Sequence, residues 1–231
     1  MKVWAISDLH LDTTTDKPMD RFGDEWIGYK EKFQEDWKTN VAEEDLVLLG
    51  GDISWAINIE EAKPDYEILR KLPGTKIVVK GNHDLYWSSL TKIQQAIPDF
   101  IFLQYNSVKI GQYIICGTRG WTYPVEGSET YEQDKKLYTR EMNRLKMSLD
   151  AMMKLRQDGD IVIGMVHFPP FNAQYEDSDT SKMFAEYKVD KVIYGHLHGN
   201  QVRSEKVVYK DGIPYYLTSA DLVDFKMTRL Y

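Results

Sequence analysis

Seven short apolar runs recur along the sequence, and their composition is typical of β-strands. Almost every residue within a run is apolar, without the strict polar alternation of a strand that faces water on one side. Near-continuous runs of this kind are typical of strands that are covered on both faces of a sheet. The predicted strands span residues 2–7, 45–50, 76–80, 100–103, 112–117, 160–166 and 191–195.

Four segments between or beside these runs carry apolar residues at helical spacing instead. They cover residues 25–38, 60–72, 87–97 and 130–157, and Pro73 and Pro98 are stop signals for the second and third. The longest segment is charged except for one apolar stripe, formed by Tyr131, Tyr138, Met142, Leu145, Leu149 and Met152. We expect this stripe to pack on the sheet rather than to bind a partner.

The carboxyl-terminal part of the sequence has a different pattern. Residues 201–220 contain two β-rich runs around Asp211-Gly212, which is typical of a hairpin, and residues 224–231 fit a last strand. The longest predicted loops are residues 13–24 and 168–181, and no repeat or linker divides the chain. We therefore predict a single domain over residues 1–231, an α/β protein with a mixed sheet or two sheets.

Composition and charge narrow the classes of protein that fit. The net charge of −7 and the pI near 5.3 argue against a surface that coats nucleic acid, because such a surface needs clustered Lys and Arg. A small phosphorylated substrate is compatible with them, since one local site can be positive. The single cysteine, Cys116, excludes an intramolecular disulfide, and we expect it to be buried in a strand. Without a secretory signal or an apolar run of membrane-spanning length, we expect a cytoplasmic protein with no membrane span.

Polar residues follow five of the predicted strands directly. Sites in α/β folds form in the crevice outside the carboxyl ends of strands, so we expect these residues to meet at one edge. They are Asp8 and His10, Asp52, Asn82 with His83 and Asp84, His167, and His196 with His198. All five histidines of the chain belong to this set, which makes five unrelated structural histidines a poor explanation. Gly51, Gly81 and Gly195 stand just before the polar groups, where the lack of a Cβ permits close approach.

The donor set is typical of a metal site. Asp, His and Asn without Cys suit divalent ions of intermediate hardness such as Mn²⁺, Fe²⁺, Zn²⁺, Co²⁺ or Ni²⁺. Seven candidate ligands exceed one tetrahedral site and fit two ions that share a carboxylate. Two ions about 3.5–4 Å apart can clamp the attacking and leaving oxygens of a phosphoryl displacement. Two such ions against the charges of Asp8 and Asp52 leave a positive pocket that attracts an anionic phosphate.

The ordered motifs resemble those of the calcineurin-like metallophosphoesterases. That family carries DxH, GD, GNH(D/E), a lone His and GHxH in this order. The chain has DLH at 8–10, GD at 51–52, GNHD at 81–84, His167, and GHLH at 195–198. The set spans about 190 residues and is highly specific as a whole. The resemblance implies a four-layer α-β-β-α sandwich of two mixed sheets, and hydrolysis of a phosphomonoester or phosphodiester by in-line attack of a hydroxide that bridges two metals.

The resemblance also implies a role for each site residue. One metal is expected on Asp8, His10, Asp52 and His198, and the other on Asp52, Asn82, His167 and His196, with Asp52 bridging. His83 is expected off the metals, as proton donor or charge stabiliser at the leaving-group oxygen, with Asp84 orienting it. The second motif continues as GDISWAI, which disfavours protein Ser/Thr phosphatases and purple acid phosphatases.

The substrate is less well defined by the sequence. Arg119 is a candidate phosphate-binding residue, although pairing with a carboxylate is the more common use of such an Arg. Tyr86 and Trp87 are candidates for stacking on a substrate, but core packing is the more common use of a residue such as Trp87. Two further hypotheses stay open. One is a nuclease of the same chemistry, for which the basic candidates are sparse: Lys188, Lys191, Arg203, Lys206 and Lys210. The other is a scaffold that retains metals without catalysis.

Overall fold

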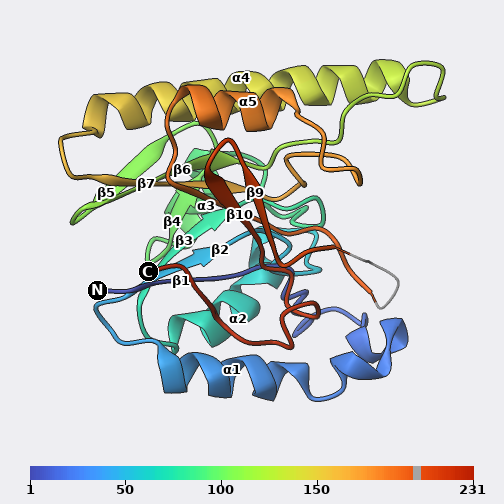
Figure 1. The fold of residues 1–231 in the computed structure, drawn as a ribbon. Coiled ribbons are helices and arrows are strands. Elements are labelled where there is room, and N and C mark those ends of the chain that lie inside the picture. The colour runs from blue at the N-terminus through green and yellow to red at the C-terminus, as the bar shows by residue number, and fades with distance from the viewer. Residues whose placement is uncertain (200–203) are drawn as a thin grey trace.

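The computed structural model describes residues 1–199 and 204–231 and contains two β-sheets (Figure 1). The five-stranded sheet has the order β11-β1-β2-β3-β4, and the six-stranded sheet has the order β5-β6-β7-β8-β10-β9. The first comprises β1 (Val3–Ile6), β2 (Leu46–Leu49), β3 (Thr75–Val79), β4 (Ile101–Leu103) and β11 (Thr228–Arg229). The second comprises β5 (Ser107–Ile110), β6 (Tyr113–Thr118), β7 (Ile161–Val166), β8 (Lys191–Tyr194), β9 (Val207–Lys210) and β10 (Ile213–Leu217).

Both sheets are mixed. Strands β1 to β4 run parallel and β11 pairs antiparallel with β1. In the second sheet β6, β7, β8 and β10 run parallel, with β5 and β9 as antiparallel edges. The predicted hairpin is confirmed in its described part, because β9 and β10 pair around Asp211 and Gly212, which both have positive φ as a two-residue hairpin turn requires.

Alternate residues of each central strand enter different cores, which explains the near-continuous apolar runs. Val3 and Leu46 face the second sheet and pack with Ile163 and Ile193. Their neighbours in sequence, such as Val47, pack instead against helices on the outer face. The sheets therefore pack on each other with helices outside both of them. This is the four-layer sandwich of two mixed sheets that the family resemblance implied.

Five α-helices within the described residues form the outer layers. Figure 1 shows α1 (Tyr29–Asn40) and α2 (Ile59–Arg70) on one side, and α4 (Tyr131–Leu155) and α5 (Asp179–Glu186) on the other. Helix α3 (Leu90–Ala96) contributes Ile93 to the same core as α1 and α2. Leu145, Leu149 and Met152 of α4 are buried, as the apolar stripe predicted. None of the described helices is both long and apolar enough to cross a membrane.

Several boundaries differ from the predicted ones for local physical reasons. Helix α1 begins at Tyr29 rather than near residue 25, because Gly28 in the left-handed region separates it from a 3-10 turn at Asp24–Trp26. The predicted loop 13–24 contains another such turn, Met19–Phe22. Strand β5 was not predicted, since all four of its residues are only half-buried at a sheet edge.

Helix α5 was also missed, because it begins inside the predicted loop 168–181. The side chains of Ser178 and Ser181 form a capping box that starts this helix. Its buried face includes Phe184, which packs in the core beneath the second sheet.

Candidate metal centre

Five strands from the two sheets deliver the predicted site residues to one place. Their carboxyl ends carry Asp8 and His10 (β1), Asp52 (β2), Asn82 to Asp84 (β3), His167 (β7), and His196 and His198 (β8). Hydrogen bonds join the two edges across the sandwich. The His196 N–H donates to Asp8 Oδ2 at 3.0 Å, and His167 Nδ1 lies 3.0 Å from the Gly50 carbonyl oxygen.

Asp8, His10, Asp52 and His198 form one group of potential ligands. Their ligand atoms all lie within 4.8 Å of one another. His10 Nε2 and His198 Nε2 are 3.2 Å apart, and His198 Nε2 is 3.3 Å from Asp8 Oδ1. His10 Nε2 is 3.8 Å from Asp52 Oδ2. These four residues are the first ligand set that the sequence resemblance implied.

A second group of polar atoms lies on the other side of Asp52. The Asn82 side-chain oxygen is 2.8 Å from both His167 Nε2 and His196 Nδ1. His167 Nε2 is also 3.4 Å from Asp52 Oδ2. One carboxylate oxygen of Asp52 therefore adjoins a histidine from each group.

The backbone is strained where it presents these side chains. Asp8, His10, Asp52 and His196 have φ angles of 61°, 46°, 51° and 72°. Non-glycine residues rarely adopt this left-handed conformation, and such residues persist where the surrounding structure forces them, often at functional sites. The strain was not visible in the sequence motifs.

Glycines before the polar residues permit the close approach that the sequence predicted. A Cβ at Gly81 would lie 2.0 Å from Asp52 Oδ1, and one at Gly195 would lie 2.4 Å from Asp8 Oδ2. Both distances are far below van der Waals contact. A side chain at Gly81 would force both the carboxylate and the backbone of Asp52 to move, and one at Gly195 would force Asp8 and Ser7 to move.

The electrostatic environment favours positive charge at the centre. Burial opposes ionisation of Asp52, but His167 and His10 outweigh it and hold the pKa of this carboxyl below its usual range. Burial also opposes the charging of His167, yet Asp52 and Asp8 raise its pKa to about 9. Burial lowers the pKa of His10 to about 4. The site thus combines ionised carboxylates with neutral and cationic imidazoles, and a metal ion binding there competes with protons for the same atoms.

The donor chemistry fits divalent cations. Two buried carboxylates, an amide oxygen and four imidazoles converge, and Cys116 lies elsewhere, buried in β6. Imidazole nitrogens of His10 and His198 face each other at 3.2 Å, an arrangement that a shared cation satisfies. His10 Nδ1 is buried and has no hydrogen-bond partner among the residues that the structure describes.

His83 lies beside this centre and half-exposed. Its ring packs against His10 and Trp55, with centroids 5.5 and 4.5 Å away. Its backbone N–H donates to Asp52 Oδ1 at 2.7 Å. Burial lowers the pKa of the His83 imidazole. The structure therefore places the ring next to the potential ligands and partly open to solvent.

Asp84 is placed differently from the expected orienting role. Its carboxylate accepts hydrogen bonds from the backbone N–H groups of Gly81, Asp52, Ile53 and Ser54, at 2.7–3.3 Å, and from the Tyr86 hydroxyl at 2.9 Å. No hydrogen bond to His83 is among those of the described residues. Burial and the charge of Asp52 raise the pKa of Asp84 to about 6. These hydrogen bonds join the two motif loops to each other.

Sequence reasoning missed two residues that support the ligands. Asp221 Oδ1 lies 3.0 Å from His198 Nδ1, which fixes the ring with its other nitrogen toward the centre. Trp55 stacks on His10 with a centroid distance of 4.7 Å. Asp221 follows the carboxyl-terminal hairpin, and no motif marks it. Trp55 stood within the second motif, but its position suggested only which subfamilies to disfavour.

Arg119, Tyr86 and Trp87 were candidates for binding substrate. Arg119 Nη2 lies 3.4 Å from Glu141 Oε1, and the guanidinium carbon lies 4.5 Å from the centroid of the Trp121 ring. Arg119 therefore pairs with a carboxylate, which was the more common alternative, and it does so at a mostly buried position. Trp87 is buried against Phe102, as the core-packing alternative predicted, and Tyr86 is equally buried.

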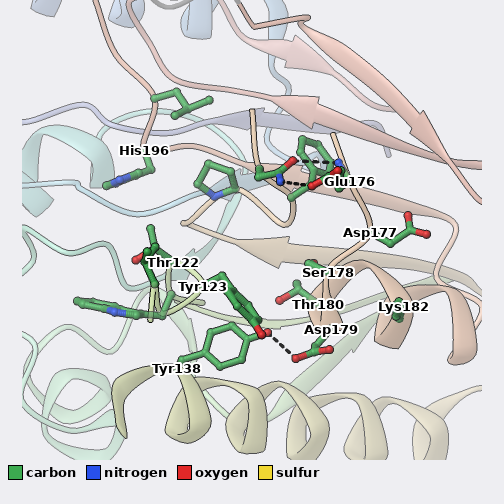
Figure 2. Close-up of a pocket in the computed structure, with 16 residues that line it drawn as sticks. Thr122, Tyr123, Tyr138, Glu176, Asp177, Ser178, Asp179, Thr180, Lys182 and His196 are labelled. Atoms are coloured by element: carbon green, nitrogen blue, oxygen red, sulfur yellow. Dashed lines mark hydrogen bonds between the residues drawn. The ribbon is translucent and has the colours of Figure 1, made fainter. Parts of the chain in front are cut away.

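A cleft of about 690 Å³ opens beside the centre, and Figure 2 shows the residues around it. His196 lies at one end, and Asp177 and Lys182 lie at the opposite end of this view. Tyr123 and Tyr138 form one wall, and Tyr138 donates a hydrogen bond to Asp179. The predicted loop 168–181 supplies much of the other wall.

The chain belongs to the calcineurin-like phosphoesterase family, whose model matches residues 1–200. This match confirms the family resemblance that the sequence motifs indicated. The family performs phosphoester hydrolysis, and the clustered Asp and His residues support metal dependence. No curated protein matches the sequence.

Solved structures share the fold at low sequence identity. TT1561 of Thermus thermophilus is 13% identical with a TM-score of 0.62, over 99% of this chain and 97% of that one. Phosphopantetheinyl hydrolase (PptH) from Mycobacterium tuberculosis is 12% identical with a TM-score of 0.59, over 99% and 95%. A protein of unknown function from Aquifex aeolicus is 17% identical with a TM-score of 0.52, over 99% and 95%. At these identities the likeness concerns the fold.

Proposed function

We propose that the protein is a two-metal phosphoesterase that hydrolyses a small phosphomonoester or phosphodiester. The position of Asp52 carries this proposal. Its Oδ2 lies 3.8 Å from His10 Nε2 and 3.4 Å from His167 Nε2, so one carboxylate adjoins both groups of potential ligands. Two separate groups around a shared carboxylate are the donor arrangement of a dinuclear site.

The residues would hold the ions in the two sets that the resemblance implied. Asp8, His10, Asp52 and His198 form one set, and Asp52, Asn82, His167 and His196 form the other. Divalent ions bound there supply Lewis-acid activation and neutralise charge on the phosphoryl oxygens. Asn82 contributes a neutral oxygen and so keeps the site positive. Asp221 orients His198, and Asp84 holds the loops that carry Asp52 and Asn82.

His83 is the proposed proton donor to the leaving-group oxygen. Its ring is half-exposed and next to the ligands, while its backbone is fixed by Asp52. Proton transfer from such a positioned side chain typically contributes about 10²–10⁴-fold to the rate. The contribution is largest for a leaving group of high pKa, since that oxygen must be protonated as it departs.

The cleft at His196 is the proposed site for the organic part of the substrate. Its volume of about 690 Å³ falls within the range of small-molecule sites. Aromatic and apolar side chains such as Tyr123 and Phe171 line it, and Glu176, Asp177 and Asp179 outnumber Lys182 at its rim. An uncharged or cationic organic group fits this rim better than an anionic one.

The geometry does not favour a nuclease. Lys191 donates to the Leu230 carbonyl and lies over the Tyr231 ring, and Lys210 pairs with Asp177. These cations are thus engaged locally, while Arg203 lies outside the described residues. A small substrate is therefore the preferred proposal over a nucleic acid.

The first experiment compares initial rates of the Mn²⁺-loaded protein on para-nitrophenyl phosphate and its bis-diester. Hydrolysis of either ester that stops with a chelator and returns with Mn²⁺ is the expected result. Faster cleavage of the diester indicates a substrate with two substituents, and faster cleavage of the monoester indicates a phosphatase. No hydrolysis of either ester with Mn²⁺, Fe²⁺, Zn²⁺, Co²⁺ or Ni²⁺ contradicts the proposal.

His83→Ala separates an enzyme from a metal-retaining scaffold. We expect a loss of about 10²-fold or more in kcat with phenyl phosphate, and a smaller loss with para-nitrophenyl phosphate, whose leaving group needs less protonation. Metal content, measured by elemental analysis, should stay unchanged. Leu85→Ala, an exposed position in the same loop, is the matched control. Unchanged turnover in His83→Ala contradicts the role given to His83.

A further inference from the structure

A second cavity, of about 110 Å³, lies beside the candidate metal centre and has a different lining. It lies where β3 and β6 end, against helix α4. Four cations and one carboxylate surround it, together with two neutral polar side chains: Lys80, Ser88, Gln104, Arg119, Arg140, Glu141 and Arg144. Neither the ligand sets nor the aromatic cleft uses this group of cations.

The Glu141 carboxylate neutralises only part of the positive charge of the four cations around the cavity. It is buried, with 1% of its side chain exposed, and Oε1 is approached by Arg119 at 3.4 Å, Arg140 at 3.3 Å and Arg144 at 2.7 Å. Its other oxygen accepts from the Thr118 hydroxyl at 2.8 Å. One carboxylate shared among three guanidinium groups leaves most of their N–H donors without an anionic partner.

Unmet hydrogen-bonding capacity remains inside the cavity wall. Only 13% of the Arg119 side chain is exposed, and its buried Nε has no hydrogen-bond partner among the described residues. Lys80 donates to the Trp87 carbonyl oxygen. A bound anion would neutralise part of the charge of these clustered cations and would accept hydrogen bonds from the free donors.

The cavity adjoins the candidate metal centre through the chain itself. Lys80 stands two residues before Asn82, and the Arg119 carbonyl oxygen accepts the N–H of His167 at 2.9 Å. The stack of Arg119 on Trp121 stands between this cavity and the cleft, since Trp121 lines the cleft. The aromatic cleft is therefore lined by one potential ligand, His196, and the cationic cavity is lined by residues of the segments that hold two others, Asn82 and His167.

We propose that this cavity binds a second phosphate group of the substrate, so that the substrate class is a small molecule with two phosphate groups, one of which is hydrolysed. The inference rests on the proposed function for the hydrolysed group, but the anion site itself does not. Arginine suits a phosphate because its planar N–H groups bind two oxygens at once.

Calorimetry with inorganic phosphate tests the cavity directly. The Mn²⁺-loaded wild-type protein should bind one more equivalent of phosphate than Arg140→Gln. Lys80→Met is a second variant with the same expected loss. Lys136→Gln, an exposed cation one turn earlier on α4, is the matched control and should bind as the wild type does. Equal stoichiometry in the wild type and both cavity variants overturns the site.

Kinetics then decides whether the anion belongs to the substrate. The ratio of kcat/KM for adenosine 3′,5′-bisphosphate to that for adenosine 5′-monophosphate should fall about tenfold or more in Arg140→Gln, as loss of one charge-assisted hydrogen bond predicts. An unchanged ratio with a lost phosphate equivalent overturns the substrate assignment, because free phosphate is then the ligand. If the wild type hydrolyses no ester, the proposed function fails while the calorimetric result still stands.

Discussion

Replacing Gly81 by alanine tests the placement of the bridging carboxylate. The new Cβ would lie 2.0 Å from Asp52 Oδ1 and 2.2 Å from the Asp52 backbone nitrogen. Ordinary contact begins at 3.4 Å, so Asp52 Oδ1 must move by about 1.4 Å. The clash involves backbone atoms as well as a side chain, so rotation of the carboxylate alone does not remove it.

A displacement of this size is expected to damage activity more than stability. A misplacement of about 1 Å in a catalytic site costs about 10²-fold in rate, and overpacking typically costs about 1–3 kcal/mol of stability. Gly81→Ala should therefore retain a cooperative unfolding transition in urea, hold less than the wild-type equivalents of metal by elemental analysis, and lose about 10²-fold in kcat/KM.

Gly159→Ala is the control for the general cost of losing a glycine. Gly159 has a φ of 87° and nothing within 4 Å of its added Cβ, so this variant bears backbone strain without the clash. It should lose some stability and keep its metals and activity. Wild-type metal content and activity within twofold in Gly81→Ala would refute the reasoning, since Asp52 would then not have to stand where the structure places it.

Three further predictions concern the supports of the site and the fold. Asp84→Ala leaves buried N–H donors without an acceptor and should lower the free energy of unfolding by about 3 kcal/mol or more in urea titrations, whereas His83→Ala should change it by less than about 1 kcal/mol. Similar values for both variants would count against the loop-joining role of Asp84. Asp221→Asn should weaken metal affinity by about 10–100-fold in competition with a chelator, because it removes the carboxylate that orients His198; wild-type affinity would show that this contact is idle. Burial alone opposes ionisation of Asp45, but hydrogen bonds from the backbone of Lys2 and Ala42 and from Trp4 lower its pKa. The stability it provides is therefore complete above its unfolded pKa of about 4 and is lost as the pH falls through its lower folded value. Asp45→Asn should cost about 1–2 kcal/mol at pH 6 and progressively less below pH 4, and a gap that stays constant down to pH 2 would contradict this.

Features encoded over a few residues were predictable from the sequence. The apolar runs predicted the central strands because both faces of these strands are covered, by the other sheet or by a helix. Each motif follows its strand within a few residues, so the site residues were predicted without the tertiary structure. Their common location then followed from the rule that sites form at the carboxyl ends of strands.

Features that depend on distant residues were not predictable in the same way. The hydrogen bonds of Asp84 reach residues 30 to 32 positions away, and nothing in the GNHD motif distinguishes them from a bond to His83. Asp221 meets His198 only because the chain returns beside β8 through the hairpin. Weak local signals also failed where tertiary packing stabilises the element, as in strand β5 and helix α5.

The sequence alone determined the layered α/β architecture, the family, and the set of residues from which a metal centre can be built. Hydrophobic periodicity and short motifs carry that information, because burial and strand ends act on neighbouring residues. Only the tertiary structure decided how Asp52 stands between two ligand groups, which carboxylate supports which loop, and that four cations share one cavity with Glu141. Those arrangements depend on contacts between segments far apart in the chain, and no local pattern records them.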